Sequence, residues 1–439
     1  MYKKKHQGLR SKAKNKMAAV SGKFSVRNPE NEYALAGELK DCGYEKIFLG
    51  SELSGELNFV RRTNSAYFAA AVYKIFKNFG RQVQDSLKER NITAPVHVLK
   101  ADGGTLPLEI ALKQPVETIF TGPAASVLGI EALGAPQVKS ISLDVGGTTT
   151  DIAFWENGLP LLARHGAKVA GYPTAVRSFH MRSVGIGGDS RIRRTETGFA
   201  VGPERIGPAM AVGGCEPTLS DALIVAGRVG FGDKAAAHKG MQQLCLMGET
   251  AVEVARQVVE AAVSVIEATI NEMLHEWSIQ PVYTVNDVIK GTEFEPELLV
   301  GVGGGAAGLI MAVGERMGLP VEIPAGATVA NAVGAALARP TLAASLRADT
   351  TEGYYLIPES GQRERLPSSF SMKMAEELLA AWLHEQAKAW QLPGQEAEVI
   401  SKEFFRTIHG YYDSGEIISL RMQLKPGILQ TVIGREVAF

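Results

Sequence analysis

The sequence predicts an α/β protein with more than one domain. Segments typical of strands alternate with segments whose apolar residues recur at helical spacing, and glycine-rich turns follow several strands. At 439 residues the chain is long enough for about three domains of roughly 150 residues, each able to bury its own core. Hydrophobic residues at 45% and charged residues at 21% are typical of a soluble globular protein.

Charge and hydropathy argue against several classes of protein. The formal net charge of -1 gives no overall attraction to nucleic acid or anionic membrane. No apolar run approaches the roughly 18 residues that span a bilayer. The cysteines, Cys42, Cys215 and Cys245, lack the spacing of zinc or redox sites and suit a reducing cytosol. We therefore expect a cytoplasmic protein with no nucleic-acid and no membrane partner.

Residues 1–17, MYKKKHQGLRSKAKNKM, form a basic segment with no acidic residue. This composition predicts a solvated, disordered tail, and an electrostatic arm for nucleic acid or lipid headgroups is the alternative. No apolar core follows the basic residues, so we do not expect a secretory signal.

Residues 18–137 carry an alternating α/β pattern. A strand in AAVSGKFSV precedes a helix that runs from RNPENE to about Cys42, and KIFLG is a second strand. The spacing of Tyr67, Ala70, Val72, Ile75, Phe76 and Phe79 predicts a helix over 64–90. The strand VHVLK and the turn ADGGT follow.

The remaining residues repeat this alternation. VKSISLDV is a strand, and a long helix from about Glu249 to Trp277 places Val252, Val259, Val263, Ile266 and Ile270 on one core-facing side. The segment ELLVGVGGGAAGLIMAVGERMGLPVEIP then indicates strand, glycine loop, helix and strand. Residues 341–439 add a C-terminal α/β unit with a helix over about Ser371–Trp390 and a strand in ISLRMQLKP.

The stretch DVGGTTTD, residues 144–151, predicts a strand, a tight glycine turn and a second strand. Gly146 and Gly147 let backbone approach a ligand, and Thr148, Thr149 and Thr150 add hydroxyl groups beside exposed amides. Such a turn suits phosphate oxygens, while Asp144 and Asp151 can hold hydrated magnesium or orient water. The lysine of a Walker loop is absent. A plain β-hairpin without a ligand is the alternative.

A second glycine loop, LLVGVGGGAAGLI, places Gly303, Gly304 and Gly305 between a strand and a helix. Adenine or ribose could lie against this backbone without meeting side chains. As a dinucleotide fingerprint the loop is weak, because the glycine pattern matches only loosely and no acidic residue stands at the expected distance. Paired with DVGGTTTD, it predicts the nucleoside half of a split ATP site.

Several motifs together carry a family resemblance. They are SVRNPENE (25–32), RRTNSAY (61–67), QPVETIFTGPAA (114–125), DVGGTTTD (144–151), VGIGGDS (184–190), VGPERIGP (201–208), PTLSDA (217–222) and VGGGAAG (302–308). In this order they resemble the hydantoinase/oxoprolinase family, which includes N-methylhydantoinase and acetone carboxylase subunits. The family belongs to the actin-like ATPases, and the resemblance covers roughly residues 18–340.

The resemblance implies the organisation and the site. It implies actin-like, ribonuclease H-like lobes: a partial N-terminal lobe over 18–137, a lobe with the phosphate hairpin and adenosine loop over 138–340, and the C-terminal unit over 341–439. The implied cofactors are ATP and Mg²⁺. Asp144 would position magnesium or water together with Asp151, Gly146 to Thr149 would bind phosphates, and Gly303 to Gly305 would bind adenosine.

The family's first phosphate hairpin has no counterpart before SVRNPENE, so the first lobe is expected to be incomplete. A truncated reading frame and a natural fragment completed by another polypeptide both account for this. The stretch KADGGT offers Asp102, Gly103, Gly104 and Thr105 as a substitute, although the family has a separate Gly-Gly turn there. A simple turn and a substrate or metal loop are the alternatives.

Weaker substrate candidates lie in two further motifs. VGIGGDS offers Gly187, Gly188 and Asp189, with a surface turn as the alternative, and PTLSDA offers Asp221, with a helix N-cap as the alternative. Arg61 and Arg62 could grip a carboxylate but are more typical of solvated ion pairs.

The resemblance implies ATP-dependent opening of a cyclic amide such as a hydantoin or 5-oxoproline, through phosphoryl transfer to the amide oxygen. The first alternative is a catalytically incomplete nucleotide-binding or scaffolding subunit that needs a separate first lobe or the family's second subunit. A sugar-kinase-like phosphotransferase is a further alternative. An oligomer is expected, and the identity of the substrate is not encoded in any motif.

Overall fold

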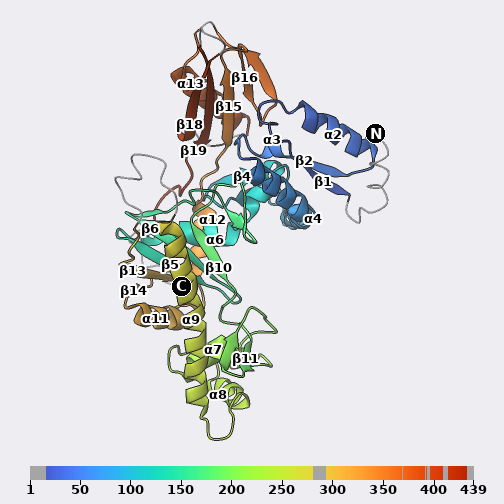
Figure 1. Cartoon of the computed structure of the whole chain (residues 1–439). Coiled ribbons are helices and arrows are strands. Elements are labelled where there is room, and N and C mark those ends of the chain that lie inside the picture. The colour runs from blue at the N-terminus through green and yellow to red at the C-terminus, as the bar shows by residue number, and fades with distance from the viewer. Residues whose placement is uncertain are drawn as a thin grey trace. The chain divides into compact units, whose positions relative to one another are not determined.

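The computed structural model describes residues 16–279, 293–367, 369–390, 392, 396–408 and 414–432. Nearly all of the basic segment 1–17 lies outside the described residues. The rest forms two compact units, each discontinuous in sequence (Figure 1). Unit 1 takes its described residues from Met1–Thr121, Ala163–Ser178 and Ala338–Gly427, and unit 2 from Gly122–Leu162, Phe179–Leu337 and Ile428–Phe439.

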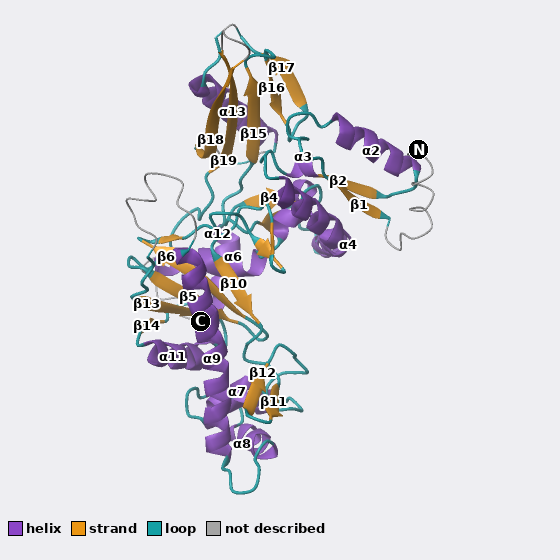
Figure 2. Ribbon diagram, viewed as in Figure 1, coloured by secondary structure: helices purple, strands orange, loops and turns teal. Residues whose placement is uncertain are grey.

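Unit 2 is organised around a mixed six-stranded sheet (Figure 2). Its strand order is β10-β6-β5-β13-β14, with β7 paired to β6. Neighbours are antiparallel from β10 to β5, whereas β13 runs parallel to both β5 and β14. The strands are β5 (Ser140–Val145), β6 (Thr150–Glu156), β7 (Leu159–Pro160), β10 (Met181–Val184), β13 (Leu298–Val302) and β14 (Val321–Glu322).

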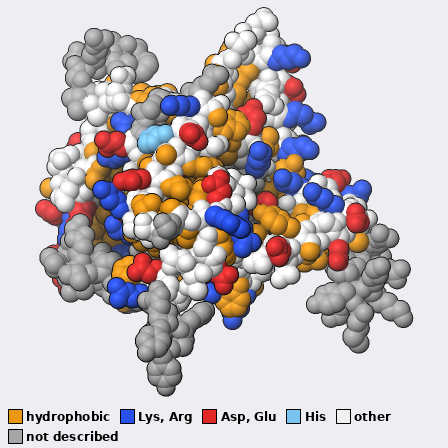
Figure 3. All heavy atoms as spheres, turned by 90° about the horizontal axis from the view of Figure 1, so that it is seen from above, with side chains coloured by type: hydrophobic (Ala, Val, Ile, Leu, Met, Phe, Trp, Pro, Cys, Tyr) orange, Lys and Arg blue, Asp and Glu red, His pale blue; other side chains and the backbone are white. Residues whose placement is uncertain are grey.

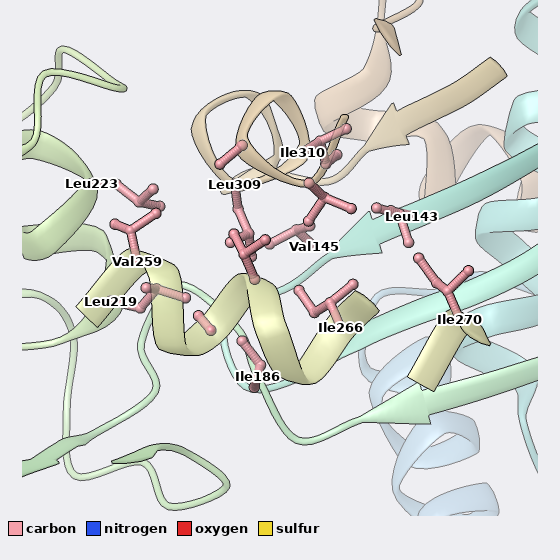
Figure 4. Packing of buried hydrophobic residues seen from close by; sticks show 14 of the residues in the cluster. Leu143, Val145, Ile186, Leu219, Leu223, Val259, Ile266, Ile270, Leu309 and Ile310 are labelled. Atoms are coloured by element: carbon pink, nitrogen blue, oxygen red, sulfur yellow. The ribbon is translucent and has the colours of Figure 1, made fainter. Parts of the chain in front are cut away.

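The long helix α9 (Ala251–Ser278) confirms the expected helix to within two residues at its start. It begins with a capping box in which Thr250 and Glu253 exchange hydrogen bonds. Val259, Ile266 and Ile270 are buried in the core formed with the sheet and with α11 (Ala306–Met317), as Figure 4 shows. The predicted apolar face is thus largely confirmed, with Val252 only half-buried.

Two short helices of unit 2 cross through small residues. The helices are α6 (Thr121–Gly134) and α12 (Ala330–Leu337). A Cβ added to Gly129 would lie 2.0 Å from the Ala330 carbonyl oxygen, and one added to Gly334 would lie 1.9 Å from the Ala125 oxygen. The two backbones therefore meet where any larger residue would separate them. Beyond them, unit 2 contains β11 (Ile192–Thr195), β12 (Gly198–Val201), α7 (Leu219–Val225) and α8 (Lys234–Gln243).

The N-terminal part of unit 1 contains the elements expected over 18–137. The strands β1 (Met17–Val20) and β2 (Lys46–Leu49) pair in parallel, and α2 (Glu30–Asp41) connects them. The helix α4 (Phe59–Glu89) starts five residues earlier than expected because Asn58 caps it by accepting from the Arg61 amide. Its neighbours are α3 (Gly50–Leu53), β3 (His97–Leu99), β4 (Thr105–Pro107) and α5 (Leu108–Ala111), with the small strands β8 (Lys168–Val169) and β9 (Tyr172–Pro173).

Side-chain burial on α4 differs from the sequence pattern. Phe76 is buried, but Tyr67, Ile75 and Phe79 are 63%, 77% and 52% exposed. Small residues such as Ala66 and Ala69 are buried instead. Arg62, which the sequence pattern assigned to solvated ion pairs, is fully buried and donates to the carbonyl oxygens of Glu56, Gly22 and Lys23. Backbone acceptors, not carboxylates, hold this guanidinium.

The C-terminal part of unit 1 is a five-stranded antiparallel sheet with the order β17-β16-β15-β19-β18. The helix α13 (Met372–Ala389) packs on it through Ala375, Leu379 and Leu383, and confirms the helix expected over Ser371–Trp390. The expected strand ISLRMQLKP falls mostly within β19. The strands are β15 (Ala343–Asp349), β16 (Tyr354–Ile357), β17 (Gln362–Arg365), β18 (Ala397–Ile408) and β19 (Ser414–Leu424).

The surface carries no single dominant charge. Basic and acidic side chains are interspersed with apolar ones on the face drawn in Figure 3, in line with the net charge of -1. Across the described residues, no helix combines the length and the apolar character needed to cross a membrane.

Candidate active site

The stretch DVGGTTTD forms the predicted hairpin between β5 and β6 in unit 2. The Gly146 amide donates to the Thr149 carbonyl oxygen (2.9 Å), which closes a tight turn. Asp144 and Asp151 are direct partners across the two strands. Thr148 and Thr149 are exposed at the turn, whereas Thr150 is buried and donates its hydroxyl to the Ile186 carbonyl oxygen. Thr150 therefore supports the fold and offers no hydroxyl to a ligand.

The environments of Asp144 and Asp151 raise both pKa values. Burial raises the pKa of Asp144, and a hydrogen bond from the Ser126 hydroxyl to Oδ2 (2.5 Å) partly opposes it. Burial raises the pKa of Asp151 to about 6, with a hydrogen bond from Ser183 opposing and the charge of Asp144 adding to it. These are neighbouring acidic groups with few compensating donors, a setting that favours an added cation or a shared proton.

A small pocket opens beside these carboxylates. Its wall includes Asp144, Asp151, Ser126 and Met181. Asn331 on α12 donates to the Ser126 hydroxyl oxygen (3.1 Å), so a chain of hydrogen bonds runs from Asn331 through Ser126 to Asp144. The pocket therefore holds two carboxylates on rigid strands, one of them oriented by side chains from α6 and α12.

The loop Gly187–Ser190 packs directly on the hairpin turn. Gly188 donates to the Gly146 oxygen (2.9 Å) and Asp189 donates through its amide to the Gly147 oxygen (2.6 Å). A Cβ added to Gly187 would lie 2.6 Å from backbone atoms of the turn, so only glycine fits there. The Asp189 carboxylate pairs with Arg205 at 2.9 Å. Gly187 and Gly188 thus brace the hairpin turn.

The second glycine loop lies at the same edge of the sheet. Because β13 runs parallel to β5, Val302 is paired with Asp144 and the loop begins beside that carboxylate. A Cβ added to Gly303, whose φ is +100°, would lie 2.6 Å from Asp144 Oδ1. One added to Gly304 would meet no atom within 4 Å. Two motifs about 160 residues apart in sequence are therefore adjacent in space, and Gly304 faces open space.

This arrangement has the donors for a nucleotide with a hydrated metal ion. Exposed turn amides and the hydroxyl groups of Thr148 and Thr149 suit phosphate oxygens. Within the described ranges, no cluster of three or more His, Cys, Asp or Glu side chains is placed to enclose a metal ion. Two adjacent carboxylates such as Asp144 and Asp151 suit a magnesium ion, because Mg²⁺ commonly binds one or two carboxylates and keeps waters or phosphate oxygens as its other ligands.

Asp221 has a structural role and is not one of the exposed groups of the candidate site. Its side chain is fully buried and accepts from the amides of Met210 (2.9 Å), Ala211 (2.8 Å) and Thr218 (2.9 Å). With Thr218 as the N-cap, Asp221 at the third helical position forms the capping box of α7, so the alternative of a helix-capping role is the one that the structure shows. Since these bonds occupy both oxygens, Asp221 organises the loop and is not accessible to substrate.

The KADGGT stretch is the turn between β3 and β4 in unit 1. Asp102 is 1% exposed and accepts from Lys100 Nζ (3.2 Å), Gln423 Nε2 (2.7 Å) and the Gly104 amide (3.1 Å). An enclosed carboxylate with three donors has no oxygen left for a phosphate-bound metal. The stretch is therefore a turn and not a second phosphate hairpin.

Sequence reasoning missed three supporting side chains. Ser126 directly follows the motif QPVETIFTGPAA and Ser183 directly precedes VGIGGDS, which were the available signals for them, while Asn331 lies apart from every motif named above. Only the packing of α6, α12 and β10 brings the three to the carboxylates or, for Asn331, to Ser126.

Comparisons with known proteins agree with this geometry. The family model for hydantoinase/oxoprolinase matches residues 62–344. The 5-oxoprolinase of Saccharomyces cerevisiae is 25% identical over 221 residues, which cover 49% of this chain and 17% of that protein.

Two solved structures share the fold. A nucleotide-free acetone carboxylase structure, from work on ATP-dependent acetone carboxylation, superimposes with a TM-score of 0.65 at 18% identity over 94% of this chain and 64% of that one. The ATP-dependent caprolactamase of Pseudomonas jessenii gives a TM-score of 0.61, again at 18% identity, over 94% and 65% of the two chains. The chain thus spans less than two thirds of each of these proteins. The expected α/β fold is confirmed, and the family model matches more than half of the sequence: the chain belongs to the hydantoinase/oxoprolinase family.

Proposed function

We propose that this protein binds ATP at the β5–β6 hairpin and uses it to open a cyclic amide of the hydantoin or 5-oxoproline type. The observation that carries the proposal is the adjacency of two glycine loops to one pair of opposed carboxylates, with Gly303 directly beside Asp144. Membership of the family and the names of its relatives, 5-oxoprolinase and ATP-dependent caprolactamase, supply the reaction class.

In this proposal each part of the site has one task. The turn amides and the hydroxyl groups of Thr148 and Thr149 bind phosphate oxygens, and Gly303 to Gly305 leave space for adenosine. Phosphoryl transfer from ATP to the amide oxygen releases ADP and makes the amide carbon more electrophilic. Water then attacks this carbon, the ring C–N bond breaks as the nitrogen takes up a proton, and a second water hydrolyses the remaining acyl phosphate to carboxylate and inorganic phosphate. Asp151 stands close to Asp144 and, with a pKa of about 6, is suited to accept or return a proton near neutral pH.

Magnesium fits the same donors. When bound, it would neutralise phosphate charge and orient the phosphates for transfer. Asp144 is the first candidate to hold it, directly or through water, because Ser126 and Asn331 fix the orientation of its carboxylate.

A second candidate function is a nucleotide-binding subunit that is catalytically incomplete alone. The favouring observation is that the other Asp-Gly-Gly-Thr stretch, at Asp102, is an enclosed turn that cannot oppose the hairpin across a nucleotide. In this case a partner subunit or a separate first lobe supplies the opposing phosphate contacts.

The test combines binding and turnover in the full chain. We expect magnesium-dependent ATP binding in the micromolar range by isothermal titration, and ATP hydrolysis stimulated by a hydantoin or 5-oxoproline. Asp144→Asn is expected to lower stimulated turnover by at least about 100-fold, since the metal and water contacts in transfer depend on this carboxylate. Glu196→Gln, an exposed change in the same unit, is the control. Wild-type turnover in the Asp144→Asn variant would refute the role, and ATP binding without any turnover would favour the second function.

A further inference from the structure

Unit 1 contains a pocket that the proposed function does not use. It has a volume of about 290 Å³, just below the roughly 300–1,000 Å³ of sites for drug-sized ligands, so an occupant would be small. Its walls come from α3, the β3–α5 region, β15, α13 and β19. The lining residues on which the inference depends are Lys100, Glu117, Glu359, Trp382, Trp390 and Arg421.

The cations of this pocket are already neutralised by carboxylates. Lys100 Nζ lies 3.2 Å from Asp102 Oδ2 and 3.8 Å from Glu117 Oε2, with almost no exposed side-chain surface. Arg421 Nη1 lies 2.8 Å from Glu56 Oε1. Lys113 also lines the pocket but is exposed, where solvent screens its charge. The enclosed part of the wall thus has no spare positive charge for an anion.

Glu359 is a carboxylate of the pocket wall that takes part in none of these ion pairs. No ion pair is formed to it within the described part of the chain, and its Oε2 is shielded from solvent without a hydrogen-bond partner there. Burial raises the pKa values of both Glu359 and Glu117. Hydrogen bonds from Ser345 and, more weakly, the charge of Arg421 oppose this rise at Glu359, and the charge of Lys100 opposes it at Glu117. The pocket wall therefore holds an acidic group, Glu359, that no enclosed cation pairs with; such a group stays protonated unless a positive charge approaches and stabilises its carboxylate form.

Another part of the pocket wall is aromatic. Trp382, Gln386 and Trp390 follow one another at intervals of four residues along α13 and its C-terminal cap, so they share one face of the helix. Both tryptophans are only half-buried. Indole rings attract cations through their faces and also pack against apolar groups.

From this combination we propose that the unit 1 pocket binds a small organic cation with an apolar body, such as an alkylammonium or amidinium group. The cationic head lies toward Glu359 and Glu117, and the apolar body lies against Trp382 and Trp390. The proposal rests on unit 1 alone and is independent of the nucleotide site of unit 2, so either one can fail without the other.

The first test compares three probes of equal chain length on the full-length protein without nucleotide. Isothermal titration near neutral pH would use n-pentylammonium chloride, 1-pentanol and sodium pentanoate. We expect the ammonium ion to bind at least tenfold more tightly than the alcohol and the carboxylate. Tighter binding of pentanoate would overturn the proposal, because the wall would then select anions through Lys100 and Arg421. Absence of binding by all three at millimolar concentrations would overturn it as well.

Variants then assign the two walls. Glu359→Gln keeps the shape of the side chain and removes its charge, and Trp382→Leu removes the indole face; each is expected to weaken pentylammonium binding at least fivefold. Glu385→Gln, an exposed change on the same helix, is the matched control and should leave binding unchanged. Circular dichroism checks folding. If both variants fold and bind like the control, the pocket is not the site and the proposal is wrong.

Discussion

At the scale of single residues, the candidate site depends on two aspartates that face each other across a hairpin. Their carboxylates are buried on strands, and each has one serine donor, Ser126 for Asp144 and Ser183 for Asp151. Neighbouring acids of this kind lose their protons in coupled steps, so a charge placed on one alters the other. The pair is therefore sensitive to pH and to bound cations.

The first residue-scale prediction concerns pH and stability. The folded pKa of Asp151, about 6, lies above the ordinary value of 3.8, so folding favours its protonated form. The resulting contribution to folding stability is fully present below about pH 4 and is lost as the pH rises through about 6. Asp151→Asn removes this titration. The difference in unfolding free energy between the variant and wild type should therefore shift in favour of the variant by about 2–3 kcal/mol as the pH rises from 4 to 7. Urea denaturation at each pH measures this difference.

Glu196→Gln serves as the control for this experiment, because its side chain is exposed in the same unit. It should show the same pH profile as wild type. A stability difference between Asp151→Asn and wild type that stays constant from pH 4 to pH 7 would contradict the raised pKa.

The second residue-scale prediction contrasts two glycines. Gly304→Ala adds a Cβ to open space, so stability should change by less than about 0.5 kcal/mol while ATP affinity falls several-fold if adenosine occupies that space. Gly187→Ala drives a Cβ against the hairpin turn and should cost about 2 kcal/mol or more. Thermal melts and ATP titration measure both effects. Unchanged affinity in a folded Gly304→Ala protein would remove the adenosine assignment.

At the scale of elements, the contact between α6 and α12 leaves no room for a side chain at two positions. At both Gly129 and Gly334, a backbone carbonyl group of the partner helix occupies the space that a Cβ atom would need. Helices approach this closely only through glycine. The contact also carries Ser126 and Asn331, which orient Asp144, so helix packing and site geometry are linked.

We therefore predict that Gly129→Ala lowers the free energy of unfolding by roughly 2–3 kcal/mol, despite alanine's better helix propensity. Gly122→Ala, at the start of the same helix and with no atom within 4 Å of the added Cβ, should be neutral or slightly stabilising. Denaturant unfolding compares the two variants. Equal stability would mean that the helices separate at little cost.

Element prediction from sequence succeeded where one face of a helix carries the core. The apolar stripe of α9 is continuous, and Val259, Ile266 and Ile270 are buried as expected. On α4 the same rule failed, because Ala66 and Ala69 are buried while Tyr67 and Ile75 are exposed. The spacing of apolar residues indicates a helix. Where small residues such as alanine make the close contacts, however, hydropathy does not identify which face of the helix is buried.

At the scale of the whole molecule, each unit has its own hydrophobic core. The core of unit 2 gathers α9, α11 and the mixed sheet, and that of unit 1 gathers α13 with the five-stranded sheet. Both units are assembled from distant parts of the sequence. Most of residues 18–137 and most of residues 341–439 belong to the same one, unit 1.

We predict that core truncations act within their own unit. Ile266→Ala should accelerate amide hydrogen exchange in β5 and β13, and Leu379→Ala in β15 and β19, each with about 2–5 kcal/mol of local destabilisation. Mass spectrometry of exchanged peptides would resolve the two patterns. Equal acceleration in both units from either change would show that they unfold as one cooperative body.

The sequence by itself determined the α/β class, the hairpin at residues 144–151, the glycine loop at 303–305 and the family. These features are local, since glycine turns, strand alternation and short motifs depend on neighbouring residues. The sequence motifs also predicted that the two loops belong to one site, and the tertiary structure brings them together through parallel pairing of β13 with β5, which joins segments far apart in sequence. Tertiary structure alone decided that Asp221 and Asp102 are enclosed, that Ser126 reaches Asp144, and that Glu117 and Glu359 line one pocket with two tryptophans in unit 1. Burial and long-range contact set these outcomes, and no window of sequence contains them.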